Sequence, residues 1–259
     1  MNKIKIVFFD IDGTLIDMDR KEISEKTIEA LTSLSKNKIK ICIATGRPLS
    51  SVPKFAGIEF DAFLTFNGSY CCTNNHEIIF SNPIPKLDVL KIIDNASRIN
   101  RPVSIASVNR IGANGKDQDL IDYYWISKQL VNVIDDFDDL ANEDIYQIML
   151  GCYESEYDKI LENVTGAKIT AWWNRAADII PANGGKGIGI AKVLEYFGLT
   201  KEEALAFGDG TNDIEMLQAV GKGIAMANAS DNVKEIADDI CGSVKEDGIY
   251  HYLKNEQII

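Results

Sequence analysis

The fold is decided by the stretch Phe8-Phe9-Asp10-Ile11-Asp12-Gly13-Thr14-Leu15. It continues an apolar run that begins at Ile4 and is interrupted only by Lys5. An apolar run that ends in acids and a glycine is typical of a buried strand that carries an active site in an open α/β sheet. The two acids, Asp10 and Asp12, require a cation, a proton or a donor nearby. An ordinary strand with an Asp-Gly turn would explain Asp12-Gly13 but not the whole pattern.

The composition is that of a globular protein with a sizeable core, since 46% of the 259 residues are hydrophobic and 25% are charged. This length suits one large domain or two small ones. The net charge of −12 argues against binding to nucleic acid or to an anionic membrane, because no surplus of Lys and Arg can neutralise phosphate backbones. A small phosphorylated substrate stays compatible, because a metal and a few local cations can offset its charge.

The cysteines indicate a reducing compartment, because the five are odd in number and none forms a Cys-x-x-Cys pair. Residues 1–5 lead directly into the first expected strand without an apolar signal region. No apolar stretch is long enough to span a membrane. We therefore expect a cytoplasmic protein, and the sequence leaves its oligomeric state, monomer or dimer, open.

Strands and helices alternate at both ends of the chain. This alternation predicts a right-handed, mainly parallel sheet. The strands expected there are 4–9, 39–44, 62–66, 204–207 and 223–226, and the helices are 23–35, one starting near Pro48, 188–197, 214–220, 232–237 and 247–253.

The middle of the chain has a different character, and prolines at Pro83 and Pro181 mark its ends. We predict a catalytic core of residues 1–81 and 184–259, with a smaller α/β domain of residues 82–183 inserted between them. The segment 135–139 is expected to be a solvated loop. The strands expected in the insert or at its entrance are 78–80, 102–108, 145–153, 169–173 and 177–180, and the helices are 87–99, 119–131 and 155–164.

Polar residues and glycine follow an apolar run, or precede a helix, at four places. Because the carboxyl ends of parallel strands converge on one crevice, three of the four can meet in space, while Lys186 arrives at a helix start. Carboxylates from Asp10, Asp12 and Asp209 would form a hard oxygen site that suits Mg²⁺ rather than zinc. The four places are Asp10 with Asp12, Thr45-Gly46-Arg47, Asn183-Gly184-Gly185-Lys186, and Gly208-Asp209-Gly210-Thr211-Asn212-Asp213.

In their order along the chain, these four places resemble the four motifs of the haloacid-dehalogenase-like superfamily. The insert lies between the second and third motifs, as in the Cof-type group (type IIB) with an α/β cap. The resemblance implies a Rossmann-like, doubly wound parallel sheet with an inserted cap. It also implies a Mg²⁺-dependent phosphatase of small phosphorylated metabolites, such as sugar phosphates. One departure is Gly184-Gly185 before Lys186, which is more glycine than the family pattern leads us to expect.

The same resemblance implies the role of each residue. Asp10 would attack phosphorus and form an aspartyl phosphate, while Asp12 would act as general acid and then as general base. Mg²⁺ would be held by Asp10, by Asp209 and by the backbone carbonyl of Asp12. The residues implied for phosphate binding are Thr45, Gly46, Arg47, Lys186 and Asn212, and Asp213 would orient Lys186 or a metal-bound water.

Two other functions stay open. A sugar-phosphate mutase or phosphotransferase would share every core motif and differ only in the group that accepts phosphate. A non-catalytic sensor of a phosphorylated ligand would need no general acid, so the presence of both Asp10 and Asp12 argues against it. The two histidines, His76 and His251, are interpreted as surface residues. Trp172-Trp173 is interpreted as part of a strand with one face in the core and one at the surface. Alternatively, Trp173, Asn174 and Arg175 line the substrate side of the cap.

Overall fold

The computed structural model of the protein describes residues 4–55 and 57–259, and the side chains of Trp172 and Trp173 lie outside this description. The chain divides into two compact units, each with its own sheet and hydrophobic core. The larger unit consists of Met1–Arg47, Val52–Ser81 and Gly185–Ile259, and the smaller unit of Pro48–Ser51 and Asn82–Gly184.

The larger unit is built on an eight-stranded sheet with the order β13-β12-β11-β1-β2-β3-β4-β5. The strands from β13 to β3 run parallel, and β4 and β5 add an antiparallel edge. The strand order reverses between β1 and β11, which is where open α/β sheets bind ligands. The strands are β1 (Ile6–Phe9), β2 (Lys40–Ala44), β3 (Ala62–Thr65), β4 (Tyr70–Thr73), β5 (Ile78–Ser81), β11 (Ala204–Gly208), β12 (Lys222–Ala225) and β13 (Asp239–Ile240).

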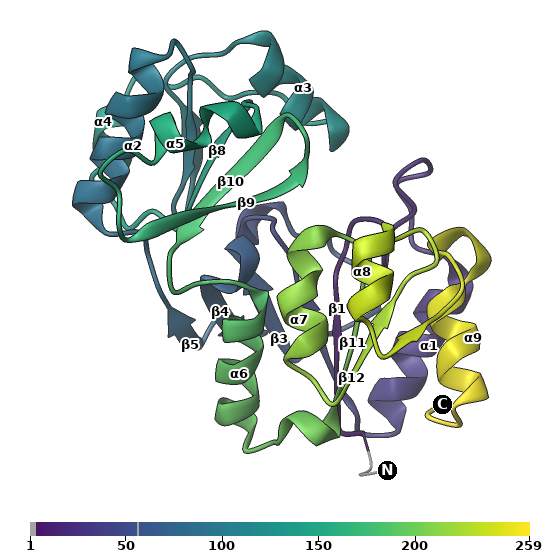
Figure 1. Ribbon diagram of the computed structural model, residues 1–259. Helices are drawn as coiled ribbons and strands as arrows, with labels where there is room; N and C mark the ends of the chain where they lie inside the picture. The colour runs from purple at the N-terminus through teal and green to yellow at the C-terminus, as the bar shows by residue number, and fades with distance from the viewer. Residues whose placement is uncertain (1–3, 56) are drawn as a thin grey trace. The chain divides into compact units, whose positions relative to one another are not determined.

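Helices cover both faces of this sheet (Figure 1). One hydrophobic core lies between the sheet and helices α1 and α9, and the other lies between the sheet and helices α6, α7 and α8. This two-sided layering is the doubly wound arrangement. The helices are α1 (Glu25–Lys36), α6 (Lys186–Phe197), α7 (Ile214–Gln218), α8 (Asp231–Ile236) and α9 (Gly248–Asn255).

Strand β1 is buried on both faces, which explains its unbroken apolar sequence. Its side chains alternate, so Val7 and Phe9 enter the core under α1 and α9 while Ile6 and Phe8 enter the opposite core. The ring of Phe9 stacks on that of Phe207 in the neighbouring strand β11, with centroids 5.5 Å apart. These contacts fix the position of the end of β1 relative to β11. They therefore also fix the position of Asp10, the next residue.

The smaller unit contains a five-stranded antiparallel sheet with the order β7-β6-β8-β10-β9. Helix α2 packs on this sheet through Val89, Ile92 and Ala96, which join its hydrophobic core. The elements are β6 (Ser104–Ala106), β7 (Ile111–Ala113), β8 (Gln147–Leu150), β9 (Ala167–Trp173), β10 (Ala176–Pro181), α2 (Lys86–Arg98), α3 (Gln118–Ile126), α4 (Phe137–Leu140) and α5 (Tyr157–Ile160).

The predicted fold class, a doubly wound parallel sheet with a smaller α/β part, is confirmed. Three short strands, β4, β7 and β13, were not predicted. The helices expected at 119–131 and 155–164 are shorter, because left-handed backbone at Lys128 (φ +54°) and Asn163 (φ +56°) follows α3 and α5. After Pro48 the chain forms only a 3₁₀ turn, η1 (Leu49–Ser51), instead of a helix.

The prediction of a solvated loop at 135–139 holds for Asp135 and Asp136 and is wrong from Phe137 on. Helix α4 begins at Phe137, and its apolar side chains Phe137 and Leu140 are buried, while the neighbouring acids stay exposed. Both histidines are exposed, as expected, and all five cysteines are buried free thiols. The interpretation of Trp173 lies outside the described side chains.

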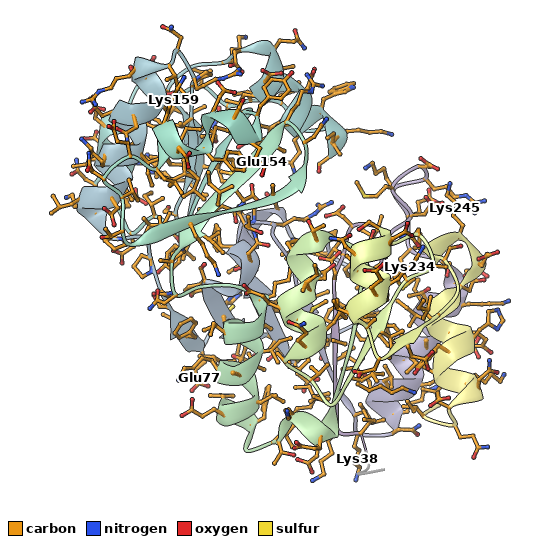
Figure 2. All side chains as sticks on the ribbon, viewed as in Figure 1. Lys38, Glu77, Glu154, Lys159, Lys234 and Lys245 are labelled. Carbon is orange, nitrogen blue, oxygen red and sulfur yellow. The ribbon has the colours of Figure 1, made fainter. Side chains whose placement is uncertain are left out.

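Charged side chains gather on the surface of each unit. In the larger unit, Lys38, Glu77 and Lys245 are exposed (Figure 2). Within residues 4–55 and 57–259, no helix combines the length and apolar character that a membrane span requires.

Candidate active site

Asp10 is the first residue beyond β1, and its backbone N–H still donates to the carbonyl of Phe207 (3.1 Å) as if the strand continued. Its side chain is only 9% exposed. The chain then turns sharply, because the N–H groups of Leu15 and Ile16 donate back to Ile11. The apolar strand thus ends with a nearly buried carboxylate at the carboxyl edge of the sheet.

Lys186 supplies the cation that Asp10 needs. It is the first residue of α6, is 1% exposed, and its Nζ donates to Asp10 Oδ1 (2.7 Å) and to Asp213 Oδ1 (2.5 Å). Burial alone would lower the pKa of this ammonium, but the two carboxylates outweigh burial and raise it. Lys186 therefore stays charged between two buried acids.

The glycine in front of Lys186, which departs from the family pattern, has a structural reason. Gly185 precedes α6 at φ +135°, a backbone conformation that L side chains rarely adopt. A Cβ there would lie 1.9 Å from Oε2 of Glu215. Gly185 thus lets the chain pass close to α7 and start α6 with the lysine pointing inward.

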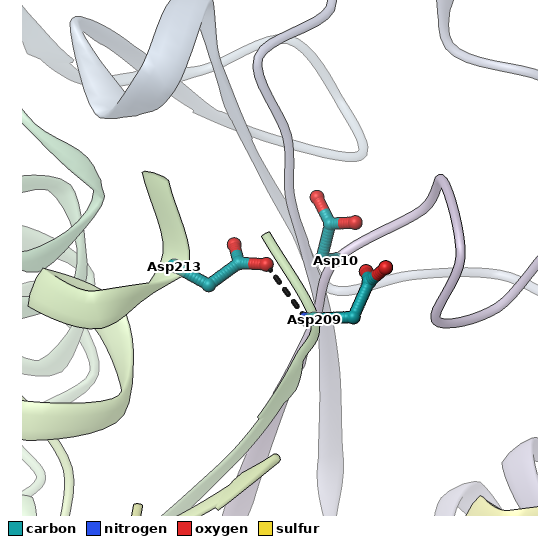
Figure 3. Close-up of side chains that lie close together, drawn as sticks. All are labelled: Asp10, Asp209 and Asp213. Carbon is teal, nitrogen blue, oxygen red and sulfur yellow. Dashed lines mark hydrogen bonds between the residues drawn. The ribbon is translucent and has the colours of Figure 1, made fainter. Parts of the chain in front are cut away.

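Both carboxylate oxygens of Asp213 accept hydrogen bonds from other residues of the chain. Its side chain is completely buried, and while Oδ1 accepts from Lys186, Oδ2 accepts from the N–H groups of Asp209 (3.0 Å) and Gly210 (2.9 Å). Figure 3 shows the first of these bonds. Asp213 therefore links the loop after β11 to the ammonium of Lys186.

Asp209 follows β11 and faces Asp10 (Figure 3). Burial, with the charge of Asp213 added, raises the pKa of Asp209 to about 7, although a hydrogen bond from the Thr14 hydroxyl (2.9 Å) opposes this. Burial also raises the pKa of Asp10 well above its usual range: Lys186 opposes the rise, and Asp213, Asp209 and Asp12 add to it. The two carboxylates therefore resist ionising together unless a further cation is present.

The donor set fits a hard divalent cation. Carboxylate oxygens of Asp10, Asp209 and Asp213 lie within 4.8 Å of one another. Oxygen ligands of this kind suit Mg²⁺, and a bound cation would remove the repulsion that raises both pKa values. Asp213 accepts three hydrogen bonds, including one from the Lys186 ammonium and two on Oδ2, whereas each oxygen of Asp209 accepts one, so Asp10 and Asp209 are the carboxylates better placed to bind an ion.

The side chain of Asp12 points to Arg47. The guanidinium Nε donates to Asp12 Oδ2 (2.7 Å) and one terminal NH₂ donates to Oδ1 (2.6 Å), which is the bidentate geometry of a strong ion pair. Donating these hydrogen bonds to Asp12 also raises the pKa of Arg47. The family resemblance implies that Arg47 binds phosphate, whereas in this structure its guanidinium binds the carboxylate of Asp12.

Thr45, Gly46 and Asn212 are joined by a residue that was not among the predicted site residues, Asn67. The N–H of Asn67 donates to the carbonyl of Thr45 (3.0 Å), and Asn67 Oδ1 accepts from Asn212 Nδ2 (3.0 Å). The Cα of Gly46 faces the Asn67 amide closely, since a Cβ there would lie 3.2 Å from it. Three of the residues predicted to bind phosphate thus lie around Asn67.

The predicted site residues did not include three polar residues of this site: Thr14, Asn67 and Asn228. Thr14 and Asn228 both donate to the carboxylate of Asp209. Asn67 and Asn228 each lie just beyond an apolar strand, β3 or β12. The rule that located the other site residues, polar groups directly after a strand, would therefore have found these two.

Comparison with known proteins agrees with this geometry. The family model of haloacid dehalogenase-like hydrolases matches residues 7–253. The 5-amino-6-(5-phospho-D-ribitylamino)uracil phosphatase YitU of Bacillus subtilis is 30% identical over 263 residues, covering 96% of each chain. The solved phosphatase BT1666 of Bacteroides thetaiotaomicron is 29% identical at a TM-score of 0.92, covering 99% of this chain and 96% of its own.

A second solved structure narrows the group. The sugar phosphatase BT4131, of HAD subclass IIB, is 30% identical at a TM-score of 0.89, covering 98% of this chain and 100% of its own. The chain therefore belongs to the haloacid dehalogenase-like hydrolases, in the Cof-type group. It is a phosphatase, a hydrolase of phosphoric monoesters.

Proposed function

We propose that this phosphatase is Mg²⁺-dependent and hydrolyses small phosphorylated metabolites, such as sugar phosphates or similar monoesters, through an aspartyl phosphate. The observation that carries the proposal is the contact between Asp10 and Lys186, a nearly buried carboxylate beside a buried cation at the carboxyl edge of the sheet. Two similar proteins support this substrate class: YitU is named as the phosphatase of a phosphorylated ribitylaminouracil, and BT4131 as a sugar phosphatase.

Asp10 and Asp209 would hold Mg²⁺ through their carboxylates, and Asp12 would do so through its backbone carbonyl. When bound, the ion would offset the negative charge that the phosphoryl group brings to these carboxylates. Asp213 is assigned to orienting Lys186, because its oxygens already bind Lys186 and two backbone N–H groups.

In the first half of the reaction, a carboxylate oxygen of Asp10 attacks phosphorus. A bond forms between that oxygen and phosphorus, the bond from phosphorus to the alcohol oxygen breaks, and Asp12 gives this oxygen its proton. In the second half, Asp12 takes a proton from water as the water oxygen attacks phosphorus. The bond to Asp10 then breaks, and inorganic phosphate leaves.

Phosphoryl oxygens would be held by the Lys186 ammonium, the Thr45 hydroxyl, the Asn212 amide and backbone N–H groups near Gly46. Asn67 connects Thr45 to Asn212 and would keep these groups at a fixed spacing. We assign Arg47 first to holding Asp12, its observed partner, and only second to phosphate binding.

We further propose that residues 82–183 form a cap that selects the alcohol part of the substrate, with residues 1–81 and 184–259 as the catalytic core. Arg175, which the sequence suggested for the substrate side of this cap, donates to Asp119 (2.9 Å) and pairs with Asp122 (3.0 Å). We place the enzyme in the cytoplasm, because a reducing compartment suits its free thiols. Its negative net charge fits neither nucleic acid nor an anionic membrane as partner.

The test is a panel of phosphorylated metabolites, rich in sugar and sugar-alcohol phosphates, with phosphate release measured in Mg²⁺ and in EDTA. We expect release from a few substrates in Mg²⁺ and none in EDTA. The Asp10→Asn variant should release none while remaining folded. Isomerised sugar phosphate with little release would instead identify a mutase, and binding without turnover would identify a sensor.

A further inference from the structure

Asn228 lies between β12 and α8, outside the four motifs, and its amide joins three separate segments. Its Nδ2 donates to the carbonyl of Gly13 (2.9 Å) and to Asp209 Oδ2 (3.2 Å). Its Oδ1 accepts from the N–H of Val244 (3.0 Å). Both ends of the amide are therefore in use, although the residue is exposed.

The partner that matters is the carboxylate of Asp209. Thr14 Oγ1 donates to Oδ1 (2.9 Å), and Asn228 Nδ2 donates to Oδ2, so each oxygen is held by a donor from a different part of the chain. Two donors on opposite edges of a carboxylate fix its rotation about the Cβ–Cγ bond. Each carboxylate oxygen offers two lone pairs, so one hydrogen bond leaves room on it for a cation.

The Asp209 carboxylate lies close to the backbone of Gly13. A Cβ on Gly13 would lie only 2.2 Å from Asp209 Oδ2, the same oxygen that Asn228 contacts. By also binding the carbonyl of Gly13, Asn228 joins the turn after Asp12 to the loop that carries Asp209. The first and fourth motifs are thus connected by a residue that belongs to neither.

We propose that Asn228 is a positioning residue that orients the Asp209 carboxylate for a divalent cation. This inference rests on the proposed function, because it assigns the cation to Asp209. The anchor at Val244 holds the amide oxygen, so that the NH₂ group is turned toward Asp209. Partners of this kind typically change metal affinity about 10–100-fold when removed. Because Asn228 is exposed, we expect the lower end, roughly tenfold.

The experiment measures binding of Mn²⁺ alone, without substrate, from the free-ion signal in electron paramagnetic resonance. Asn228→Ala and Asn228→Leu are compared with wild type; leucine keeps the shape of asparagine and removes its hydrogen bonds. Asn37→Ala is the matched control, because Asn37 is also exposed and its Nδ2 also donates to a backbone carbonyl, that of Ile258 (3.1 Å).

We expect both Asn228 variants to bind Mn²⁺ roughly tenfold more weakly, and Asn37→Ala to bind it like wild type. The Mg²⁺ concentration that half-activates phosphate release should rise by the same factor. Unfolding temperatures in EDTA should match that of the control variant.

Unchanged Mn²⁺ affinity in Asn228→Ala would overturn the inference. Wild-type affinity in Asn228→Leu would also overturn it, because a side chain of the same size without hydrogen bonds would then be enough to orient Asp209. A lower unfolding temperature without a change in Mn²⁺ affinity would show a purely structural residue and would overturn it as well. Wild-type protein that binds Mn²⁺ but releases no phosphate would overturn the proposed function and leave this inference standing. If wild type binds no Mn²⁺, the inference is wrong.

Discussion

The ammonium of Lys186 lies 2.7 Å from Oδ1 of Asp10, and both side chains are almost fully withdrawn from water. The two residues are 176 positions apart in the chain. A buried charge without a partner is strongly unfavourable, so each residue stabilises the charged form of the other. The same ammonium also serves Asp213, which makes it the centre of the site.

Replacing Lys186 with methionine should abolish phosphate release and lower stability. The change leaves Asp10 and Asp213 without their cation, and breaking a buried ion pair from one side typically costs about 3 kcal/mol or more of the free energy of unfolding. Urea unfolding at neutral pH measures the loss. Adding Asp213→Asn to this variant should recover part of the stability but none of the activity; if the double variant is the less stable one, the charge argument is wrong.

Replacing Gly13 with alanine should displace Asp209 and weaken metal binding. The new Cβ would lie 2.2 Å from Asp209 Oδ2, and the backbone at Gly13 has φ +90°. Gly198→Ala is the matched control, because Gly198 also has a positive φ of +65°, but a Cβ added to it would meet no atom within 4 Å. Both variants should lose about 1 kcal/mol of stability from the backbone. Only Gly13→Ala should show a higher half-activating Mg²⁺ concentration; equal values in the two variants would contradict the steric argument.

Replacing Arg47 with lysine should lower kcat roughly tenfold with little change in KM. General acid–base catalysis typically contributes about 10²–10⁴-fold to the rate. Lysine cannot form the bidentate pair of hydrogen bonds that Arg47 makes with Asp12, so part of this rate enhancement is lost. Steady-state kinetics on the best substrate measure both constants. Arg98→Lys, a change in an exposed pair with Asp94, serves as control. A higher KM at unchanged kcat would instead return Arg47 to phosphate binding.

Replacing Asp12 with alanine should trap the phosphoryl group on the protein. An aryl phosphate has a good leaving group, so its first step needs little acid help, whereas the second step lacks the base that activates water. We expect a burst of aryl alcohol about equal to the amount of enzyme, followed by slow turnover. Hydroxylamine-sensitive phosphate should remain on the protein. No such label should form when Asp10 is also replaced with asparagine, and its persistence there would exclude Asp10 as the nucleophile.

The metal-free protein should lose stability as pH rises through neutrality. Burial raises the pKa of Asp209 from its ordinary value of 3.8 to about 7, so the folded chain holds this proton more tightly than the unfolded chain. The associated stability is present below the ordinary pKa and is lost as pH rises through about 7. Mg²⁺ competes with the proton, so the rise in unfolding temperature that it causes should grow over the same window.

Thermal unfolding in EDTA and in Mg²⁺, between about pH 5 and 8, measures both effects. Asp209→Asn is the control, because an amide does not titrate. Its metal-free stability should fall less steeply over this window than that of wild type. Parallel pH profiles for the two proteins would show that Asp209 does not titrate there.

Much of the fold could be predicted because burial leaves a direct mark on the sequence. Strand β1 is covered on both faces and reads as a continuous apolar run that stops at Asp10. Short elements leave weaker marks. Strand β7 (Ile111–Ala113) has three residues, and helix α4 is a single turn whose Phe137 and Leu140 stand among four acids. There, contacts with the core of the smaller unit outweigh the local preference for a loop.

The amino-acid sequence was enough to name the residues that reach the site, because parallel strands deliver whatever follows them to one edge of the sheet. Asp10, Asp12, Thr45 and Asp209 could be named in this way, and Lys186 through the resemblance to the family. Which atom meets which became visible only in three dimensions: Lys186 between Asp10 and Asp213, Arg47 on Asp12, and Asn228 on Asp209. These contacts join residues up to 176 positions apart, and they depend on rotamers that packing selects after the strands are in place.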